Sequence, residues 1–293
     1  MNSQLGPALQ KRAVCRTTCA THSAGQIPEK RRNSRMRVET QGIVIRVSDV
    51  GERDRLVTLL TRDRGVVRAF ARNSRAAKSS LVSATQLFCY ARILLFCGKE
   101  KYMIDDAQPL QVFFELRQDI GRLALAQYFC ELAGALAPQE EAETAADFLR
   151  LLLLAFQRLC KGGRPLPVVK SAVEMRMMSL AGYLPDLIGC TDCRRYEDDV
   201  MYFYPQQGVL LCKNCREKRG RGGGLLLHRG ALTALRHTVY AELPKLFSFT
   251  LGREGQQELA RASEAYLLDR AEYRFRTLDF YHTVADPLKT ESS

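Results

Sequence analysis

The sequence predicts an α+β protein of several domains: a small five-stranded β-barrel, then a helical domain that carries an inserted metal-binding ribbon. Three observations support this fold class. Residues 36–110 contain short runs of alternating apolar residues with no long helix among them. From about residue 110 onward, apolar residues recur at steps of three and four, which is the helical period. Two Cys-x-x-Cys pairs, 18 residues apart, interrupt the helical part.

The composition indicates a globular protein that stays inside the cell. The chain has 293 residues, of which 46% are hydrophobic, and this is enough for buried cores. The longest apolar run, residues 149–156, is far shorter than the roughly 20 residues that span a bilayer. No secretory signal pattern precedes residue 36, so we expect a cytoplasmic protein with reduced cysteines and no membrane contact.

The net charge of +12 is concentrated in the N-terminal third. A basic surplus of this kind indicates a polyanionic partner, and we expect nucleic acid. Residues 1–35 contribute to the surplus, but their apolar residues follow no period. We therefore predict that residues 1–35 form a disordered basic extension. A transit peptide and a misassigned start are the alternatives for this segment.

Residues 36–110 are predicted to form the barrel. Its five expected strands are residues 38–47, 56–61, 66–71, 87–97 and 101–107. Charged or glycine-containing turns separate them. Five short strands without a long helix fit the OB-fold, a barrel that often binds nucleic acid. An SH3-like barrel has nearly the same strand spacing and remains the alternative.

Six basic residues in this barrel lie within residues 62–78, and only Asp63 opposes them. The six predicted DNA-binding residues are Arg62, Arg64, Arg68, Arg72, Arg75 and Lys78. Arg68 and Arg72 should share a face, because side chains four apart in a strand point the same way. The small polar residues 73–80 suit a loop that follows a phosphate backbone. The alternative is a charged loop that is merely solvated.

Five aromatic residues belong to the predicted barrel. They are Phe70, Phe88, Tyr90, Phe96 and Tyr102. Any aromatic ring on the surface can stack on a base. In so small a barrel, however, we expect most of the five to fill the interior, so none is assigned to a base.

The helical domain is predicted in two parts, residues 111–189 and 219–283, with a ribbon between them and a tail at 284–293. Its expected helices are residues 110–132, 145–159, 167–181, 225–246 and 254–280. Because the ribbon interrupts the helical pattern, the two parts have to pack together to cover their apolar faces.

Residues 190–218 are predicted to form a zinc ribbon. The expected ligands are Cys190, Cys193, Cys212 and Cys215. Each pair presents two thiolates, and two pairs supply the tetrahedral four-sulfur shell of one structural Zn²⁺. Two disulfides are the alternative. A catalytic zinc is disfavoured, because a closed shell of four cysteines leaves no position for water.

The chain lacks the patterns of a nucleic-acid enzyme. Its histidines are His22, His228, His237 and His282, and they form no motif with neighbouring acids. There is no Gly-x-x-x-x-Gly-Lys-Ser/Thr phosphate loop and no compact acidic cluster for two metal ions. We therefore expect a protein without catalytic activity and without a small-molecule substrate.

Several local patterns resemble the RecO family of bacterial recombination mediators, from residue 36 to about residue 282. They are the opening residues 42–45, the turn and strand 51–61, the loop 71–79 and the stretch 180–185, which stands just before the first cysteine pair. Their order, with the cysteines in the expected place, carries the resemblance.

The resemblance implies an OB-fold, a helical domain and a zinc-binding insert. It further implies a nucleoid-associated DNA repair protein that binds single- and double-stranded DNA and anneals complementary strands without ATP. The implied partners are RecR, with RecA and RecF indirectly, and the acidic C-terminal tail of single-stranded DNA-binding protein. We expect that tail to dock on the helix face around Arg117, Arg122 and Tyr128. Packing of this face against other elements is the alternative, and a zinc-ribbon RNA-binding or transcription-associated factor is the alternative function.

Overall fold

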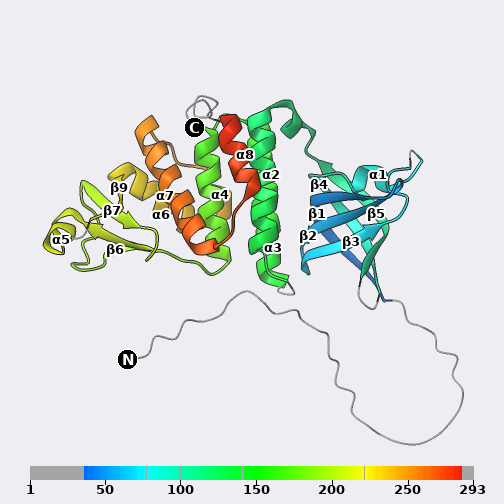
Figure 1. The fold of residues 1–293 in the computed structure, drawn as a ribbon, viewed down its shortest axis with the longest axis horizontal. Helices are drawn as coiled ribbons and strands as arrows, with labels where there is room; N and C mark the ends of the chain where they lie inside the picture. The colour runs from blue at the N-terminus through cyan, green and yellow to red at the C-terminus, as the bar shows by residue number, and fades with distance from the viewer. Residues whose placement is uncertain (1–35, 77, 99–100, 140–141, 221, 286–293) are drawn as a thin grey trace, which may run out of the picture. The chain divides into compact units, whose positions relative to one another are not determined.

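The computed structural model describes residues 36–76, 78–98, 101–139, 142–220 and 222–285 (Figure 1). The predicted basic extension, residues 1–35, lies outside the described residues, and so does the predicted tail from residue 286 onward. Among the described helices, none combines the length and the apolar composition that crossing a membrane requires.

The N-terminal strands close into a barrel with the order β1-β2-β3-β5-β4. The elements are β1 (Met36–Val50), β2 (Asp54–Thr61), β3 (Gly65–Ala71), α1 (Leu81–Ala84), β4 (Cys89–Cys97) and β5 (Tyr102–Val112). The barrel closes where β1 pairs with β4 and where β3 pairs in parallel with β5. This arrangement is the OB-fold rather than the SH3-like barrel. The predicted fold class is confirmed.

Aliphatic residues and alanines, rather than aromatics, fill the barrel. The interior cluster includes Val57, Leu59, Ala69 and Ile93, and of the five aromatics only Tyr102 packs against it. The expectation that most aromatics fill the interior is therefore wrong. The physical reason is that side chains alternate between the two faces of each strand, and the inward positions are held mainly by alanine and aliphatic residues.

A β-bulge in β1 divides the outer surface of the barrel. The register shifts between Val44 and Arg46, so Ile45 and Arg46 both face outward although they are consecutive. Ile45 is buried against Gly134 of the helix α2 (Ile120–Leu136), where a Cβ added to the glycine would lie 3.5 Å from Ile45 Cδ1. Arg46 is exposed. The bulge thus separates the part of the barrel that the helices cover from the part that solvent reaches.

The other end of the barrel also touches the helices. Phe88 is fully buried, and its ring lies 5.3 Å from that of Phe156 on α3 (Ala142–Lys161) in an edge-on contact. Gly65 opens β3 with a φ of +60°, and a Cβ there would lie 1.8 Å from the carbonyl oxygen of Pro138. Only glycine fits this close approach.

Helices begin later than the sequence predicts. β5 runs through Pro109 and Leu110 to Val112, because Pro109 pairs with Ala91 of β4. The helical elements are η1 (Phe114–Gln118), α2 (Ile120–Leu136), α3, α4 (Leu166–Leu180), α6 (Arg229–Tyr240), η2 (Leu243–Lys245), α7 (Arg253–Ala271) and α8 (Arg276–Ala285). α8 lies beside α2, and α7 beside α4 (Figure 1). The single helix expected for residues 254–280 is broken at Glu272, whose φ is +46°.

The cysteine segment forms a four-stranded sheet with the order β6-β8-β7-β9. Its elements are β6 (Asp186–Cys190), β7 (Val200–Tyr204), β8 (Val209–Cys212), α5 (Lys213–Lys218) and β9 (Leu225–His228). The sheet extends beyond the predicted residues 190–218, because β9 pairs with β7 where a helix was expected. Phe203 of β7 packs against Tyr266 of α7, with ring centroids 5.8 Å apart. The ribbon is therefore anchored to the helical core.

Candidate metal centre and nucleic-acid interface

The four predicted cysteine ligands converge. The Sγ atoms of Cys190, Cys193, Cys212 and Cys215 all lie within 4.8 Å of one another. Cys193 Sγ and Cys212 Sγ are 3.7 Å apart, close to the about 3.8 Å edge of a tetrahedron with metal–sulfur bonds of about 2.3 Å. Disulfide sulfurs lie about 2.05 Å apart, so the arrangement is a four-sulfur cluster rather than two disulfides.

Electrostatics in this cluster favour a bound cation. Burial opposes ionisation of Cys190, but hydrogen bonds from the backbone N–H groups of Cys193, Cys212 and Asp192 lower its pKa to about 7. Hydrogen bonding with Cys212 and burial raise the pKa of Cys215 to about 12, and the other sulfurs add to the rise. Because neighbouring sulfurs raise the pKa of Cys215, a positive charge between them would favour its thiolate form. The donor set fits a metal ion.

Backbone hydrogen bonds close each cysteine knuckle. In the first knuckle, the N–H of Arg194 donates to the carbonyl of Cys190, and the N–H of Cys190 donates to the carbonyl of Arg195, both at 2.9 Å. In the second, the N–H of Arg219 donates to the carbonyl of Cys215 at 3.1 Å. The Arg219 guanidinium forms an ion pair with Asp192, which joins the two knuckles.

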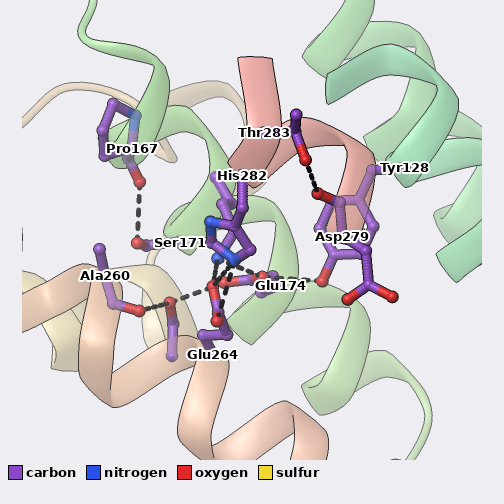
Figure 2. Close-up of polar contacts among 11 residues, drawn as sticks. Tyr128, Pro167, Ser171, Glu174, Ala260, Glu264, Asp279, His282 and Thr283 are labelled. Carbon is purple, nitrogen blue, oxygen red and sulfur yellow. Dashed lines mark hydrogen bonds and ion pairs between the residues drawn. The ribbon is translucent and has the colours of Figure 1, made fainter. Parts of the chain in front are cut away.

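A buried ionic network lies in the helical domain (Figure 2). Lys170 Nζ of α4 lies 2.7 Å from Glu174 Oε1 and 2.6 Å from Glu264 Oε2 of α7. Tyr128 of α2 donates its hydroxyl to Glu174 Oε1 at 2.8 Å, and His282 Nε2 of α8 lies 3.0 Å from Glu264 Oε2. The network links four helices. Removing one partner of such a buried pair costs about 3 to 5 kcal/mol, because a charge is left unpaired.

The network keeps its ions charged. Burial alone raises the pKa of Glu264, but the hydrogen bond with His282 and the Lys170 ammonium outweigh it and lower that pKa to about 2. Burial opposes the charge on Lys170, but Glu174 and Glu264 raise its pKa above the usual value. The network thus ties α2, α4, α7 and α8 together through charged side chains.

The three residues expected to dock a partner lie in different environments. The expectation that Tyr128 lies on the surface is wrong, because its side chain is fully buried in the network. Burial and the neighbouring Glu174 raise the pKa of Tyr128 well above its usual value. Arg117 is exposed, donates to the carbonyl of Leu87 at 3.0 Å and lies over Phe88. Arg122 lines a cavity.

That cavity, of about 170 Å³, lies between the first turn of α2, the end of α3 and the start of α4. Three arginines surround it: Arg122, Arg158 and Arg164. Its apolar walls are Leu159, Leu166 and Val169. Asp119 also lines it, but this carboxylate caps α2 by accepting from the Arg122 N–H at 2.8 Å. Arg158 Nε is buried without a hydrogen-bond partner in the described part of the chain. The sequence did not predict Arg158 and Arg164 as part of this site, because they follow Arg122 by more than thirty residues.

The barrel exposes the central arginines of the predicted strip. Along β3, Val67, Ala69 and Ala71 face inward, whereas Arg68 is exposed; Arg72, which follows the strand, is exposed too. Because Arg72 lies in the turn after β3, the expectation that it shares a face with Arg68 stays a prediction. No acidic group of the described residues lies within ion-pair distance of either arginine, so both charges are available to an anion.

The strand register adds a cation that the sequence analysis missed. Arg46 of β1 pairs with Thr58 of β2, and Thr58 pairs with Arg68 of β3. Because directly paired residues point to the same face, Arg46 and Arg68 lie in one row across the sheet. The bulge in β1 is what turns Arg46 to that face.

The remaining predicted DNA-binding residues lie at the two ends of β3. Arg62 and Arg64 lie in the β2–β3 turn. The eight residue steps from Arg64 to Arg72 span about 26 Å along an extended strand. At the other end, Arg75 donates to the carbonyl of Gly51 at 3.2 Å and lies 3.7 Å from Asp49. Lys78 is exposed. The six residues therefore follow one strand and its ends rather than forming one cluster.

Family comparisons cover most of the chain. Residues 36–113 match the family model described as Recombination protein O N terminal. Residues 117–279 match the model described as Recombination protein O C terminal. The boundary between the two models falls at the structural boundary between β5 and the helices.

Two curated relatives match this chain over nearly their full length, and a third matches over about two thirds of it. The chain is 33% identical over 248 residues to a protein named DNA repair protein RecO from Acetivibrio thermocellus, which covers 84% of this chain and 97% of the relative. A protein of the same name from Symbiobacterium thermophilum is 33% identical over 247 residues, 83% of this chain and 96% of the relative. One from Desulforudis audaxviator is 38% identical over 180 residues, 61% of this chain and 71% of the relative.

Proposed function

This chain belongs to the RecO family of DNA repair proteins, and on that premise we propose that it is a non-enzymatic mediator of homologous recombination. In this proposal it binds single- and double-stranded DNA, anneals complementary strands, and works with RecR to load RecA on DNA coated by single-stranded DNA-binding protein. The observation that carries the proposal is the row of unpaired, outward-facing arginines on β1 and β3 of the OB-fold barrel.

The physical basis of binding is counterion release. Each arginine that neutralises a phosphate releases condensed cations from the DNA, which gives strong salt dependence and little sequence preference. Annealing then needs no nucleotide, because base pairing is already favourable and a cationic surface reduces the repulsion between two phosphate backbones.

We assign Zn²⁺ to the four cysteines as a structural ion. A closed four-sulfur shell is the usual structural zinc site and leaves no open position for chemistry. The cluster stands at the end of the ribbon sheet, between β6, β8 and α5. Zinc there holds the two knuckles together and takes no part in contacts with DNA.

The arginine-lined cavity supports docking of the acidic tail of single-stranded DNA-binding protein. A tail that carries carboxylates and ends in apolar residues requires cations beside apolar walls. Arg122, Arg158 and Arg164 supply the cations, and Leu159 and Leu166 supply the walls. Arg158 adds a positive charge to the cavity wall, and a guanidinium can form charge-assisted hydrogen bonds with a carboxylate.

A peptide of the cognate tail is expected to bind wild-type protein and to bind an Arg122→Ala/Arg158→Ala variant about 10-fold more weakly or worse. Each charged hydrogen bond contributes about 1.5 to 3 kcal/mol. Fluorescence anisotropy measures the affinity. The matched control is Arg150→Ala/Arg261→Ala, which removes two exposed arginines away from the cavity. Equal binding by both double variants, or no binding by wild type, rules out this docking site.

The proposed function is tested by strand annealing without nucleotide. Complementary strands, each coated with the cognate single-stranded DNA-binding protein, should anneal faster when the purified protein is added. ATP should not change the rate. Competition with RNA of matched sequence separates this function from that of an RNA-binding zinc-ribbon factor, which would prefer the RNA. Absence of annealing, or annealing only with ATP, contradicts the proposal.

A further inference from the structure

The barrel surface beyond the bulge has alternating cationic and apolar rows. The first row is Arg46, Thr58 and Arg68, and the second is Ser48, Leu56 and Phe70. Arg72 follows Phe70 at the next outward position of the chain. We call these seven residues the open face.

Phe70 stands at the centre of the cationic part of the open face. It belongs to neither hydrophobic core cluster, and its ring makes no aromatic or cation–π contact with the described residues. It is half-buried between Ala69 and Ala71, both of which face fully inward. Its cross-strand neighbours are Leu56 of β2, which is 37% exposed, and Met103 of β5. Arg68 and Arg72, on either side of Phe70 in the sequence, have no acidic partner among the described residues. Packing of the barrel interior therefore does not explain this half-exposed phenylalanine.

We propose that Phe70 is a base-stacking platform, which makes the open face a binding site for single-stranded nucleic acid. The proposal rests on the proposed function and extends it by naming the residue that distinguishes single strands from duplexes. Arg68 and Arg72 hold phosphates on either side, and the ring of Phe70 holds a base between them.

The geometry suits a single strand. Side chains two apart on one face of a strand are about 7 Å apart, so Arg68 and Phe70 are neighbours on β3, and Arg72 follows in the turn directly after the strand. Stacking on an aromatic ring needs an accessible base face, which a single strand offers and a duplex hides inside its stack. The arginines serve both kinds of DNA, because phosphates are exposed in both.

Tryptophan fluorescence provides a direct test, because the chain contains no tryptophan. A Phe70→Trp variant carries a single reporter at the proposed platform. Its emission should be quenched when oligo-dT binds, with the same midpoint as binding measured by anisotropy, and a duplex of equal length should quench little. Phe280→Trp, which places the reporter at an exposed position on α8, is the control and should not be quenched.

The affinity test uses Phe70→Leu, which keeps an apolar side chain next to Leu56. Its affinity for oligo-dT should fall about 5- to 150-fold, the range of one lost base stack. Its affinity for duplex DNA should change less than about two-fold, and its salt dependence should stay parallel to that of wild type, since no phosphate contact is removed. Phe280→Leu is the control and should bind both DNAs as wild type does.

The outcomes separate this inference from the function on which it rests. If Phe70→Leu binds single strands as wild type does, or if Phe70→Trp binds without quenching, Phe70 is only a surface packing residue and the platform is refuted while the DNA-binding function stands. Equal losses on single strands and duplexes also refute it. If wild-type protein binds neither DNA, the proposed function itself fails.

Discussion

Replacing Cys193 with serine is expected to release the metal and unfold the ribbon. Structural zinc sites in small domains contribute an apparent binding free energy of about 10 to 16 kcal/mol, and a site that loses one of four thiolates loses much of it. Metal analysis should fall from about one zinc per chain to near zero, and the melting temperature should drop by several degrees or more. Unchanged metal content in this variant contradicts the assignment of Cys193 as a ligand.

Cys97→Ser is the matched control. Cys97 is a half-buried free thiol at the end of β4, outside the four-sulfur cluster. This variant should keep its zinc. Since the barrel has its own hydrophobic cluster, the metal-free Cys193→Ser protein should still bind DNA within a few-fold of wild type. A metal-free protein that stays folded but no longer binds DNA would mean that the metal takes part in binding.

Local patterns in the sequence predict the parts of this fold that depend on neighbours in the chain. The spacing of Cys190 and Cys193, and of Cys212 and Cys215, predicts the cluster because each knuckle is closed by hydrogen bonds within a few residues. Alternation along β3 likewise predicts that Arg68 faces outward while Val67 and Ala69 face inward. These features require no knowledge of which strands pair.

Features that depend on pairing between distant segments were missed. Arg46 faces outward because of a bulge in the pairing of β1 with β2, and β9 is a strand because it pairs with β7. The basic cavity is built from three helices. The position of Tyr128 was predicted wrongly because α2 is apolar on all its sides, as its buried residues Leu125 and Phe129 illustrate. The period of apolar residues therefore does not show which face of the helix is buried. The partner of Tyr128, Glu174, lies 46 residues away.

The largest expected effect on function comes from removing the exposed arginines Arg46, Arg68 and Arg72, which we call the arginine row. A variant with Arg46→Ala, Arg68→Ala and Arg72→Ala removes three exposed cations that have no acidic partner in the described chain. Each lost phosphate contact should reduce the slope of log affinity against log salt by about 0.7 to 0.9. If the two proteins bind equally at about 1 M salt, the variant should bind about 100-fold more weakly or worse at about 0.1 M.

A charge-matched control separates the location of the charge from its amount. Arg150→Ala, Arg261→Ala and Lys218→Ala also removes three exposed cations, from α3, α7 and α5. Its net charge equals that of the arginine-row variant. Circular dichroism melting of both proteins should show that the barrel and helices remain folded.

Equilibrium binding of oligo-dT over a range of salt concentrations, for wild type and both triple variants, is the measurement that tests most directly whether the barrel holds DNA by its backbone. We predict that the slope of the arginine-row variant is shallower than that of wild type by about 2 to 3 units, while the control keeps the wild-type slope. Equal slopes for the two variants would show that DNA binds elsewhere on the protein.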